Sequence, residues 1–298
     1  MIHHSIAIAA LARNCETNLP GNIKRIEELR RIFDKSWVFV YENDSTDSTK
    51  SILDQWATSS NDVIVKQEHL EEMRMVQSAT NRFYKGVSLS RMNRMSFCRN
   101  CLLNMIKAAC TPDYVLFVDS DILSFSVEGV VKSITQAPQG WGALFANCYM
   151  TFTANGKTKD IPIYYDTFPY IATSHKVEAI RQFEISQFYR FFVSKKLYAL
   201  VQQQDYFQCD SSFGGIGIYR YDCIKDLEYK PFRPERWELK NIAMCEHVYF
   251  NMNIHSPKFI SRELRSCYAD YSCHGIKGWL LQHFPTLYVL CSNLHNMI

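Results

Sequence analysis

The sequence predicts an α/β protein with a mixed, mainly parallel sheet flanked by helices. Short apolar runs of strand length alternate with segments whose apolar residues recur at helical spacing, from residue 5 to residue 118. Strands that alternate with helices in this way form parallel sheets with right-handed crossovers. Ligands of such sheets bind beyond the carboxyl ends of the strands, so we expect the functional site in the loops that follow them.

The first element is the apolar run SIAIAALA at Ser5–Ala12, which has the length of a buried strand. An Asn, Pro and Gly turn at 18–21 follows it. In IKRIEELRRIF, at Ile23–Phe33, the apolar residues fall at helical spacing and predict a helix. The segment WVFVY at Trp37–Tyr41 is again apolar, aromatic and β-branched, and predicts the second strand.

The next elements repeat this order. Turn and N-cap residues at Asp44–Thr49 precede a predicted helix at Lys50–Ala57. A short strand is predicted at Val63–Lys66 and a long helix at Arg91–Ala109. The apolar run YVLFV at Tyr114–Val118 is the next core strand, and it ends directly at an Asp-Ser-Asp sequence.

The second half is more mixed. We expect strands at Leu144–Tyr149 and Ile216–Tyr219 and a helical segment within Val177–Gln204. The sequence has no internal repeat and no low-complexity linker, and 298 residues fit one large domain against a prior of roughly 150 residues per domain. We predict a single domain over 1–265, with halves at 1–125 and 126–265, and an extension at 266–298 packed on it.

Composition excludes several classes of protein. Hydrophobic residues make up 47% of the chain, and Gly and Pro number only 11 and 9, so fibrous and disordered classes are excluded. The 33 Lys and Arg against 30 Asp and Glu give a net charge of +3, too balanced for a nonspecific nucleic-acid binder. We therefore expect no nucleic acid as a partner.

The eleven cysteines and the missing signal-peptide pattern indicate reduced thiols in the cytoplasm. Cys98 and Cys101 have CxxC spacing without a second pair, so we expect buried thiols rather than a zinc or redox site. Gly278–Ile298 lacks Lys, Arg, Asp and Glu but contains many polar residues. It predicts a helix docked on the domain or peripherally on a membrane surface, and not a span.

Asp119 and Asp121 form the sharpest local motif, because both carboxylates follow an apolar strand directly. Such a pair can hold a hard divalent cation and leave positions open for the oxygens of a diphosphate. The alternative is that Asp121 caps the helix that follows.

A second acidic loop, ENDSTDST, follows the second strand. Glu42 or Asp44 is placed to hydrogen-bond a ribose or a base edge. A capping box before the next helix is the alternative for Ser45–Thr49. Four arginines on or near these elements are candidates for the phosphates, although each taken singly is more often a solvated surface residue: Arg13, Arg91, Arg94 and Arg99.

Two further motifs lie in the second half. Gly214, Gly215 and Gly217 lie in one short loop, where a ligand can approach the backbone; a glycine-bearing hairpin is the alternative. In Cys245-Glu246-His247, the Glu is a candidate general base and the His a candidate ligand for a metal or phosphate.

Six blocks in this order resemble the GT-A glycosyltransferases, and within them the fungal capsule-associated and α-1,3-mannosyltransferase family with its bacterial and viral relatives. The resemblance spans about residues 6–265, and its blocks are ENDSTDST, RMNRMSFCRNCLL, FVDSDI, YYDTFPY, SSFGGIGIYR and CEHVYFN. One departure is that YYDTF is followed by PYIATSHK instead of the family's usual Arg-Asp pair, so sugar or acceptor recognition in that loop can differ.

The resemblance implies a GT-A fold, a nucleotide-binding first half and an acceptor-binding second half. It also implies that Asp119 and Asp121 are a DxD motif for Mn²⁺ or Mg²⁺, with His247 or His255 completing the metal shell. The residues expected at the donor are Arg13, Glu42, Asp44, Arg94, Arg99, Asn100, Ser120, Asp166, Gly214 and Gly215. Glu246 takes the place of the family's acidic acceptor-site residue.

The expected function is metal-dependent transfer of a sugar from a nucleoside diphosphate, as a GDP- or UDP-sugar, to a glycan or lipid-linked hydroxyl. Inversion makes Glu246 the base, whereas retention makes Glu246 or Asp210 a stabiliser of the anomeric centre; the resemblance favours retention. A nucleotidyltransferase is disfavoured because the loop after the first strand has little glycine, and a non-catalytic sugar-binding protein is the third hypothesis. We expect a cytoplasmic protein, soluble or peripherally attached through its tail.

Overall fold

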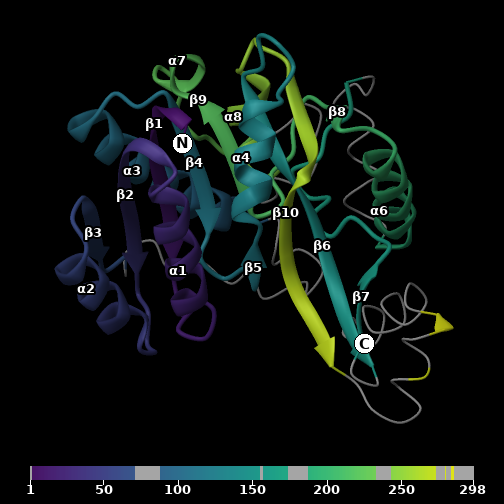
Figure 1. Ribbon diagram of the computed structural model, residues 1–298, viewed down its shortest axis with the longest axis horizontal. Coiled ribbons are helices and arrows are strands. Elements are labelled where there is room, and N and C mark those ends of the chain that lie inside the picture. The colour runs from purple at the N-terminus through teal and green to yellow at the C-terminus, as the bar shows by residue number, and fades with distance from the viewer. Residues whose placement is uncertain are drawn as a thin grey trace.

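A computed structural model of the protein describes residues 2–70, 88–154, 157–173, 187–232 and 243–272, together with 279, 283 and 284. Its framework is one ten-stranded sheet (Figure 1). The strands are β1 (Ile2–Ala12), β2 (Phe33–Asn43), β3 (Val63–Glu68), β4 (Tyr114–Asp119), β5 (Ser124–Phe125), β6 (Ala143–Ala154), β7 (Lys157–Ile161), β8 (Tyr206–Gln208), β9 (Ile216–Arg220) and β10 (Lys258–Ser272). The sheet order is β3-β2-β1-β4-β9-β6-β10-β5, with β7 beside β6 and β8 beside β10.

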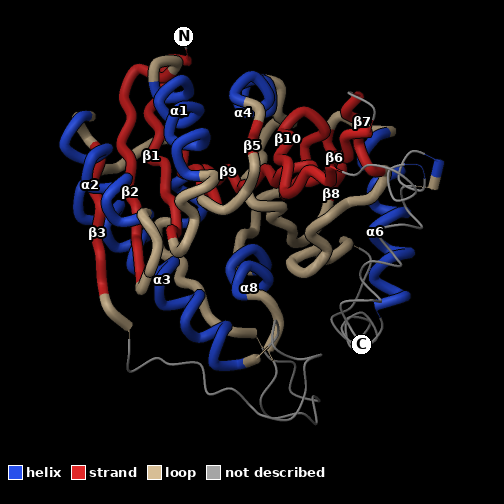
Figure 2. Tube along the Cα trace, turned by 90° about the horizontal axis from the view of Figure 1, so that it is seen from below, coloured by secondary structure: helices blue, strands red, loops and turns tan. Residues whose placement is uncertain are grey.

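The helices lie on both faces of this sheet, which confirms the predicted α/β class. They are α1 (Leu19–Arg30), α2 (Thr49–Ser59), α3 (Leu89–Ala109), α4 (Val127–Thr135), α6 (Gln187–Gln202), α7 (Tyr221–Ile224) and α8 (Glu246–Met252). Core residues of α1, α2 and α4 pack on one face, and those of α3, α6 and α8 pack on the other. Figure 2 shows α1 and α4 on one side of the sheet and α3 and α8 on the opposite side.

The first four core strands are parallel, and their register determines where the site forms. β1 pairs with β2 on one side and with β4 on the other, and β2 pairs with β3. Leu11 lies beside Asp119, and Ala12 lies beside Glu42. The carboxyl ends of these strands therefore meet at one edge of the sheet. From β4 to β9 and from β9 to β6 the pairing is antiparallel, so the sheet is mixed with its longest ladders parallel.

Two boundaries differ from those expected. The first helix begins at Leu19 and takes Pro20 into its first turn, where the missing N–H costs no intrahelical hydrogen bond. It ends at Arg30, and Phe33 opens β2 instead of closing the helix, because its side chain is buried in the core. The other predicted strands and helices of residues 1–125 lie within observed elements.

The second half contains three strands that the sequence pattern did not predict, β7, β8 and β10. β10 pairs in parallel with β6 along its length and antiparallel with β5 and β8. The predicted domain boundary at residue 265 falls inside this strand, so residues 266–272 belong to the sheet. Within the helical segment expected at 177–204 the structure has α6, whereas residues 177–186 of that segment lie outside the described residues. Most of the predicted tail helix also lies outside them.

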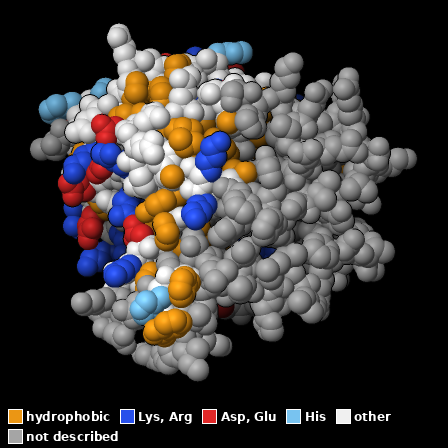
Figure 3. All heavy atoms as spheres, turned by 90° about the vertical axis from the view of Figure 1, so that its right-hand side faces the viewer, with side chains coloured by type: hydrophobic (Ala, Val, Ile, Leu, Met, Phe, Trp, Pro, Cys, Tyr) orange, Lys and Arg blue, Asp and Glu red, His pale blue; other side chains and the backbone are white. Residues whose placement is uncertain are grey.

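The described surface is mixed in character. On the face shown in Figure 3, hydrophobic, basic and acidic side chains of the described residues intermingle. None of the helices in the described ranges combines the length and apolar character that crossing a bilayer requires. The cysteines of the described ranges carry no disulfide, and burial raises the pKa of the Cys98 thiol to about 12, as expected for a buried structural thiol.

Candidate functional site

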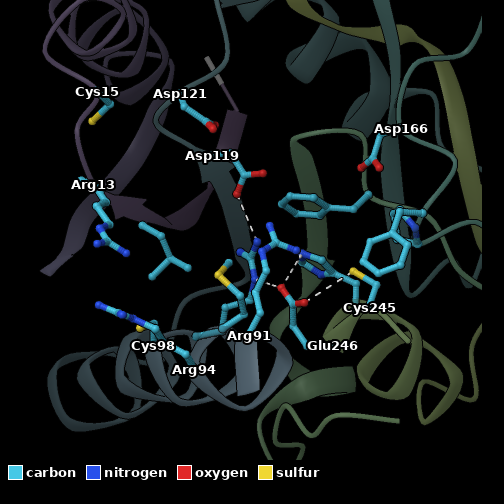
Figure 4. A pocket seen from close by; sticks show the side chains of 18 of the residues that line it. Arg13, Cys15, Arg91, Arg94, Cys98, Asp119, Asp121, Asp166, Cys245 and Glu246 are labelled. Atoms are coloured by element: carbon cyan, nitrogen blue, oxygen red, sulfur yellow. Dashed lines mark hydrogen bonds and ion pairs between the residues drawn. The ribbon is translucent and has the colours of Figure 1, made fainter. Parts of the chain in front are cut away.

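A pocket of about 450 Å³ opens where the carboxyl ends of β1, β2 and β4 meet the start of α8 (Figure 4). Figure 4 shows arginines on one side and carboxylates above and on the opposite side. The predicted site residues that line this pocket are Arg13, Arg91, Arg94, Arg99, Asp119, Asp121, Asp166, Glu246 and His247. Segments from both predicted halves of the chain therefore build one site.

Two asparagines at the start of α1 hold the loop that carries Asp119 and Asp121. Asn22 Nδ2 donates to the carbonyl oxygens of Ser120 at 3.3 Å and Ile122 at 2.8 Å, and Asn18 Nδ2 donates to that of Asp121 at 2.7 Å. These bonds use the backbone of the loop. The two carboxylates are left to face the pocket, while Ser120 is buried and lies outside its lining.

The helix-capping alternative for Asp121 does not hold. The N-cap of α4 is Ser126, whose Oγ accepts a hydrogen bond from the backbone N–H of Gly129 at 2.9 Å. Because the cap is provided five residues later, the position of Asp121 at the pocket is not explained by helix initiation.

The glycine loop fixes two of the carboxylates in place. Gly214 and Gly215 have φ angles of +67° and +80°, which favour glycine. The N–H of Gly214 donates to Asp166 Oδ2 at 3.2 Å, and the N–H of Asp119 donates to the carbonyl of Gly215 at 2.9 Å. A Cβ on Gly214 would lie 2.8 Å from the carbonyl oxygen of Ala146. Neither glycine lines the pocket, so the loop positions Asp119 and Asp166 instead of offering its own backbone.

Arg99 connects the two halves of the site from beneath. Its NH2 group donates to Asp119 Oδ1 at 3.1 Å and its Nε donates to Glu246 Oε1 at 2.8 Å. The guanidinium lies over the rings of Phe213 and Tyr229, at 4.9 Å and 5.9 Å from their centroids. Only 3% of Arg99 is exposed. In this structure it is therefore a buried counterion shared by two carboxylates at the pocket lining, and its expected place near the ribose or phosphates stays a prediction.

The crowding of carboxylates changes their protonation. Burial raises the pKa of Asp119 to about 7, and the charges of Asp121 and Asp166 act in the same direction against the Arg99 guanidinium. Burial also raises the pKa of Asp121. The negative charge of this group is therefore costly without a cation, which is the electrostatic signature of a cation-binding or catalytic site.

In the ENDSTDST loop, Asn43 lines the pocket, whereas Asp44 lies outside the lining and positions an arginine. Although burial acts in the opposite direction, hydrogen bonds from Asn43, Leu70 and His69 and the charge of Arg94 lower the pKa of Asp44 to about 2. Asp44 thus holds Arg94 in an ion pair at the pocket wall.

Glu42 lies in the same loop but is fully buried. Its Oε1 accepts from the backbone N–H of Ser45 at 2.8 Å, and it lies outside the pocket lining. The capping-box alternative is not observed, because the N-cap Ser48 makes no side-chain capping bond.

Three other predicted residues lie away from the pocket lining. Asn100 exchanges hydrogen bonds with the backbone of Tyr229, at 2.9 Å and 2.7 Å, so it tethers a loop. Asp210 and His255 lie outside the lining, and His255 is exposed.

Sequence reasoning missed several lining residues. Tyr268 on β10 stacks on Tyr165 with ring centroids 4.0 Å apart, and both line the pocket with Phe213 and Asn43. Tyr165 and Phe213 lie in motifs that the sequence did single out. Tyr268 lies in no such motif and on β10, a strand that the sequence pattern did not predict.

The residues present fit a divalent cation held jointly with a ligand. Within the described ranges, no group of three or more His, Cys, Asp or Glu side chains is preassembled for a metal, so His247 is not grouped with Asp119 and Asp121. Mg²⁺ and chemically similar ions, however, are commonly bound by one or two carboxylates together with substrate phosphates and water. The Asp119 and Asp121 pair, with its raised pKa values, supplies this smaller set of hard oxygen ligands.

Comparison with known proteins identifies a family for the chain. Residues 5–253 match the sequence model of a family described as cryptococcal mannosyltransferase 1. A search of curated proteins finds no match.

Solved structures also align with the chain. Staphylococcus aureus TarS aligns with 96% of this chain and 65% of its own, at 15% identity and a TM-score of 0.42. The mannosyltransferase PcManGT from Pyrobaculum calidifontis, solved with GDP-Man and Mn²⁺, aligns with 98% of this chain and 64% of its own, at 13% identity and a TM-score of 0.49. The chain thus spans less than two thirds of these structures.

Proposed function

The chain belongs to the cryptococcal mannosyltransferase 1 family of glycosyltransferases, and from this membership we propose that its pocket binds a nucleoside-diphosphate sugar and transfers the sugar to an acceptor hydroxyl. One observation carries the proposal beyond the family. The pocket at the carboxyl edge of the sheet separates its charges, with Arg13 and Arg94 on one side and Asp119 and Asp121 on another. A diphosphate needs both, because cations bind its oxygens and carboxylates hold its metal ion.

Each part of the proposed donor has side chains suited to it. Arg13 and Arg94 bind phosphate oxygens, with Arg94 oriented by Asp44. Asp119 and Asp121 would hold Mn²⁺ or Mg²⁺. When bound, the ion would neutralise charge on the departing diphosphate. Asp166, held by the backbone of Gly214, lies across the pocket and is placed to accept hydrogen bonds from sugar hydroxyls.

Glu246 is the carboxylate proposed to act at the reacting carbon. Arg99 occupies its Oε1, whereas among the described residues Oε2 has only a weak thiol contact, with Cys245 at 3.5 Å. In an inverting reaction Oε2 takes the acceptor proton, and in a retaining reaction the carboxylate stabilises the positive anomeric centre. The position of Asp210 outside the pocket lining supports Glu246 for either role.

The test is the release of the nucleotide from UDP-, GDP-, CMP- and dTDP-sugars by purified protein, with Mn²⁺ and then with EDTA; the CMP-sugar can release only a monophosphate. We expect release of one diphosphate with Mn²⁺ only, and its loss in Asp119→Asn and Asp121→Asn. Asp222→Asn is the matched control, because Asp222 is exposed, pairs with Arg220 and lies outside the pocket lining.

Two added measurements, sugar binding by the Asn variants and incubation with a nucleoside triphosphate and a sugar phosphate, separate the alternative functions. A sugar-binding protein would retain its affinity in both Asn variants and release nothing. A nucleotidyltransferase would instead release pyrophosphate from a nucleoside triphosphate and a sugar phosphate. Either result would overturn the proposal.

The proposal extends to the acceptor and the compartment. It takes the acceptor to be a glycan or lipid-linked hydroxyl that the protein meets in the cytoplasm, in soluble or peripherally attached form. Carbonate extraction of membranes from expressing cells tests the attachment: we expect the protein in the supernatant, and a carbonate-resistant pellet would contradict this part.

A further inference from the structure

His247 is a buried polar residue whose hydrogen-bonding capacity is unused. Only 2% of it is exposed, and within the described part of the chain neither ring nitrogen has a hydrogen-bond partner. Its Nε2 lies 3.8 Å from Glu246 Oε1, beyond hydrogen-bond distance. Buried polar groups in native proteins are nearly always paired, and a missing partner requires an explanation.

Aromatic neighbours hold the imidazole ring of His247 in place. It stacks on Phe213 with centroids 3.8 Å apart and meets Tyr229 edge-on at 5.5 Å. Burial, with the charge of Arg99 as a second cause, lowers the pKa of His247 well below its usual value, so the imidazole is neutral. A neutral imidazole presents one N–H donor and one acceptor nitrogen.

The ring belongs to the part of the pocket that lies away from the phosphate-binding arginines. His247 lines the pocket next to Glu246, at the start of α8. Figure 4 shows Glu246 and Asp166 on the side opposite Arg13 and Arg94. A donor with its diphosphate at the arginines and at Asp119 would place its sugar toward Glu246 and His247.

We propose that His247 is a substrate-binding residue that hydrogen-bonds a hydroxyl of the transferred sugar and thereby makes the enzyme selective for donors that carry this hydroxyl. Because a hydroxyl group can both donate and accept, it can pair with a ring nitrogen of a neutral imidazole whichever tautomer is present. A site built to bind a hydroxyl rejects the analogue that lacks it, because the polar group of the site is then left unpaired. This inference rests on the proposed function and specifies its sugar end.

The test compares binding of a nucleotide sugar with binding of its nucleoside diphosphate. The variants are His247→Phe, which keeps an aromatic ring for stacking, and His247→Gln, which keeps a donor and an acceptor. His255→Phe is the matched control, because His255 follows the same helix but is exposed and outside the pocket lining. Calorimetry with Mn²⁺ gives the Kd of the donor that wild type turns over, of its deoxy-sugar analogues and of the diphosphate alone.

We expect His247→Phe to weaken nucleotide-sugar binding by about 10- to 100-fold and diphosphate binding by less than about twofold. His247→Gln recovers part of the affinity, and the control matches wild type. Wild type discriminates against one deoxy analogue, and His247→Phe loses that discrimination. The ligand-free Tm of His247→Phe stays at or above that of wild type, because no protein hydrogen bond is removed.

Other outcomes would overturn the inference. An equal loss of affinity for the nucleotide sugar and for the diphosphate would place His247 at the nucleotide. A loss confined to Mn²⁺ affinity would make it a metal ligand. A clear fall in Tm, or unchanged binding in both variants, would make it a core residue. If wild type binds no nucleotide sugar, the proposed function itself fails, whereas a normal wild type with unaffected variants contradicts only the role of His247.

Discussion

Arg99 and Glu246 form a buried ion pair, with Nε and Oε1 2.8 Å apart, between residues separated by 147 positions in the chain. Both side chains are about 3% exposed, and the same guanidinium also binds Asp119. The pair joins α3 to the start of α8 directly beneath the pocket. The carboxylate proposed to act at the sugar and the carboxylate proposed to hold the metal thus share one counterion.

Removing Arg99 should destabilise the protein strongly. We expect Arg99→Met to lose about 3–5 kcal/mol in its free energy of unfolding, because Glu246 is left as an uncompensated buried charge. The double variant Arg99→Met with Glu246→Met should be more stable than the sum of the single losses predicts. Urea denaturation of the four proteins measures this coupling, and strictly additive losses would show that the pair is not coupled.

Metal affinity should depend on pH through Asp119. Its pKa of about 7 means that the carboxylate is largely protonated below that pH and that the metal must displace the proton. We therefore expect Mn²⁺ affinity, measured with the nucleoside diphosphate, to rise between about pH 6 and pH 8. A flat profile in wild type, or the same slope in Asp119→Asn, would contradict this prediction.

The raised pKa of Asp119 also makes the stability of the protein depend on pH. Because the folded pKa of Asp119 lies above its unfolded value of 3.8, the folded state binds the proton more tightly. The contribution of Asp119 to stability is therefore full below about pH 4 and is lost as the pH rises through about 7. In metal-free protein, Asp119→Asn should flatten this part of the curve of unfolding free energy against pH.

Gly214→Ala should cost more than backbone strain alone. A Cβ at this position would lie 2.8 Å from the carbonyl oxygen of Ala146 and 2.9 Å from Cys148 Cβ. The backbone would have to move to relieve these contacts, and with it the N–H of Gly214 that donates to Asp166. Gly140→Ala is the matched control, since Gly140 also has a positive φ of +76° but has nothing within 4 Å.

We expect Gly140→Ala to cost about 1 kcal/mol and Gly214→Ala clearly more, together with a loss of transfer activity. Thermal unfolding and diphosphate release measure the two effects. Equal stability losses and full activity in both variants would show that the close approach at Gly214 is unimportant.

Asp44→Asn should weaken binding of the nucleotide while leaving the metal site unchanged. Asp44 lies outside the pocket lining and contacts two residues of that lining, Arg94, with which it pairs, and Asn43, whose Nδ2 donates to it. Loss of that charge frees Arg94 from its fixed orientation, so we expect the Kd of the diphosphate to rise about 3- to 10-fold. Calorimetry with Asp54→Asn as an exposed control measures this, and an unchanged Kd would show that Arg94 needs no such support.

The sequence predicted those parts of the site that depend on local pattern. Asp119 and Asp121 end an apolar strand, and parallel strands place such ends at one edge, so their meeting with Arg13 followed from topology. Glu42 and Asp44 also lie at a strand end, as predicted. The side chain of Glu42, however, is buried in its own loop, and that of Asp44 forms an ion pair with Arg94. Position at a strand end was predictable, whereas side-chain direction was not.

The rest depended on contacts between distant segments. Arg99 resembles any helical arginine until Glu246 is packed against it. β10 alternates charged and apolar residues irregularly and shifts register twice against β6, so no simple period marks it as a strand. Gly214 was noticed for its freedom of conformation, but the neighbours that require glycine there come from β6.

The place of β10 within the sheet has a consequence for how the protein is made. Strand β6 is bordered on one side by β9 and on the other by β10, which is synthesised more than a hundred residues later. During synthesis on the ribosome, the edge of β6 that pairs with β10 therefore stays unpaired until β10 has been made. Unpaired strand edges can form hydrogen bonds with other chains and cause aggregation. The region matched by the family ends at residue 253, before β10 begins. A recombinant fragment cut at that point would keep the residues proposed for the chemistry, yet it would lose Tyr268 and expose the edge of β6 to aggregation.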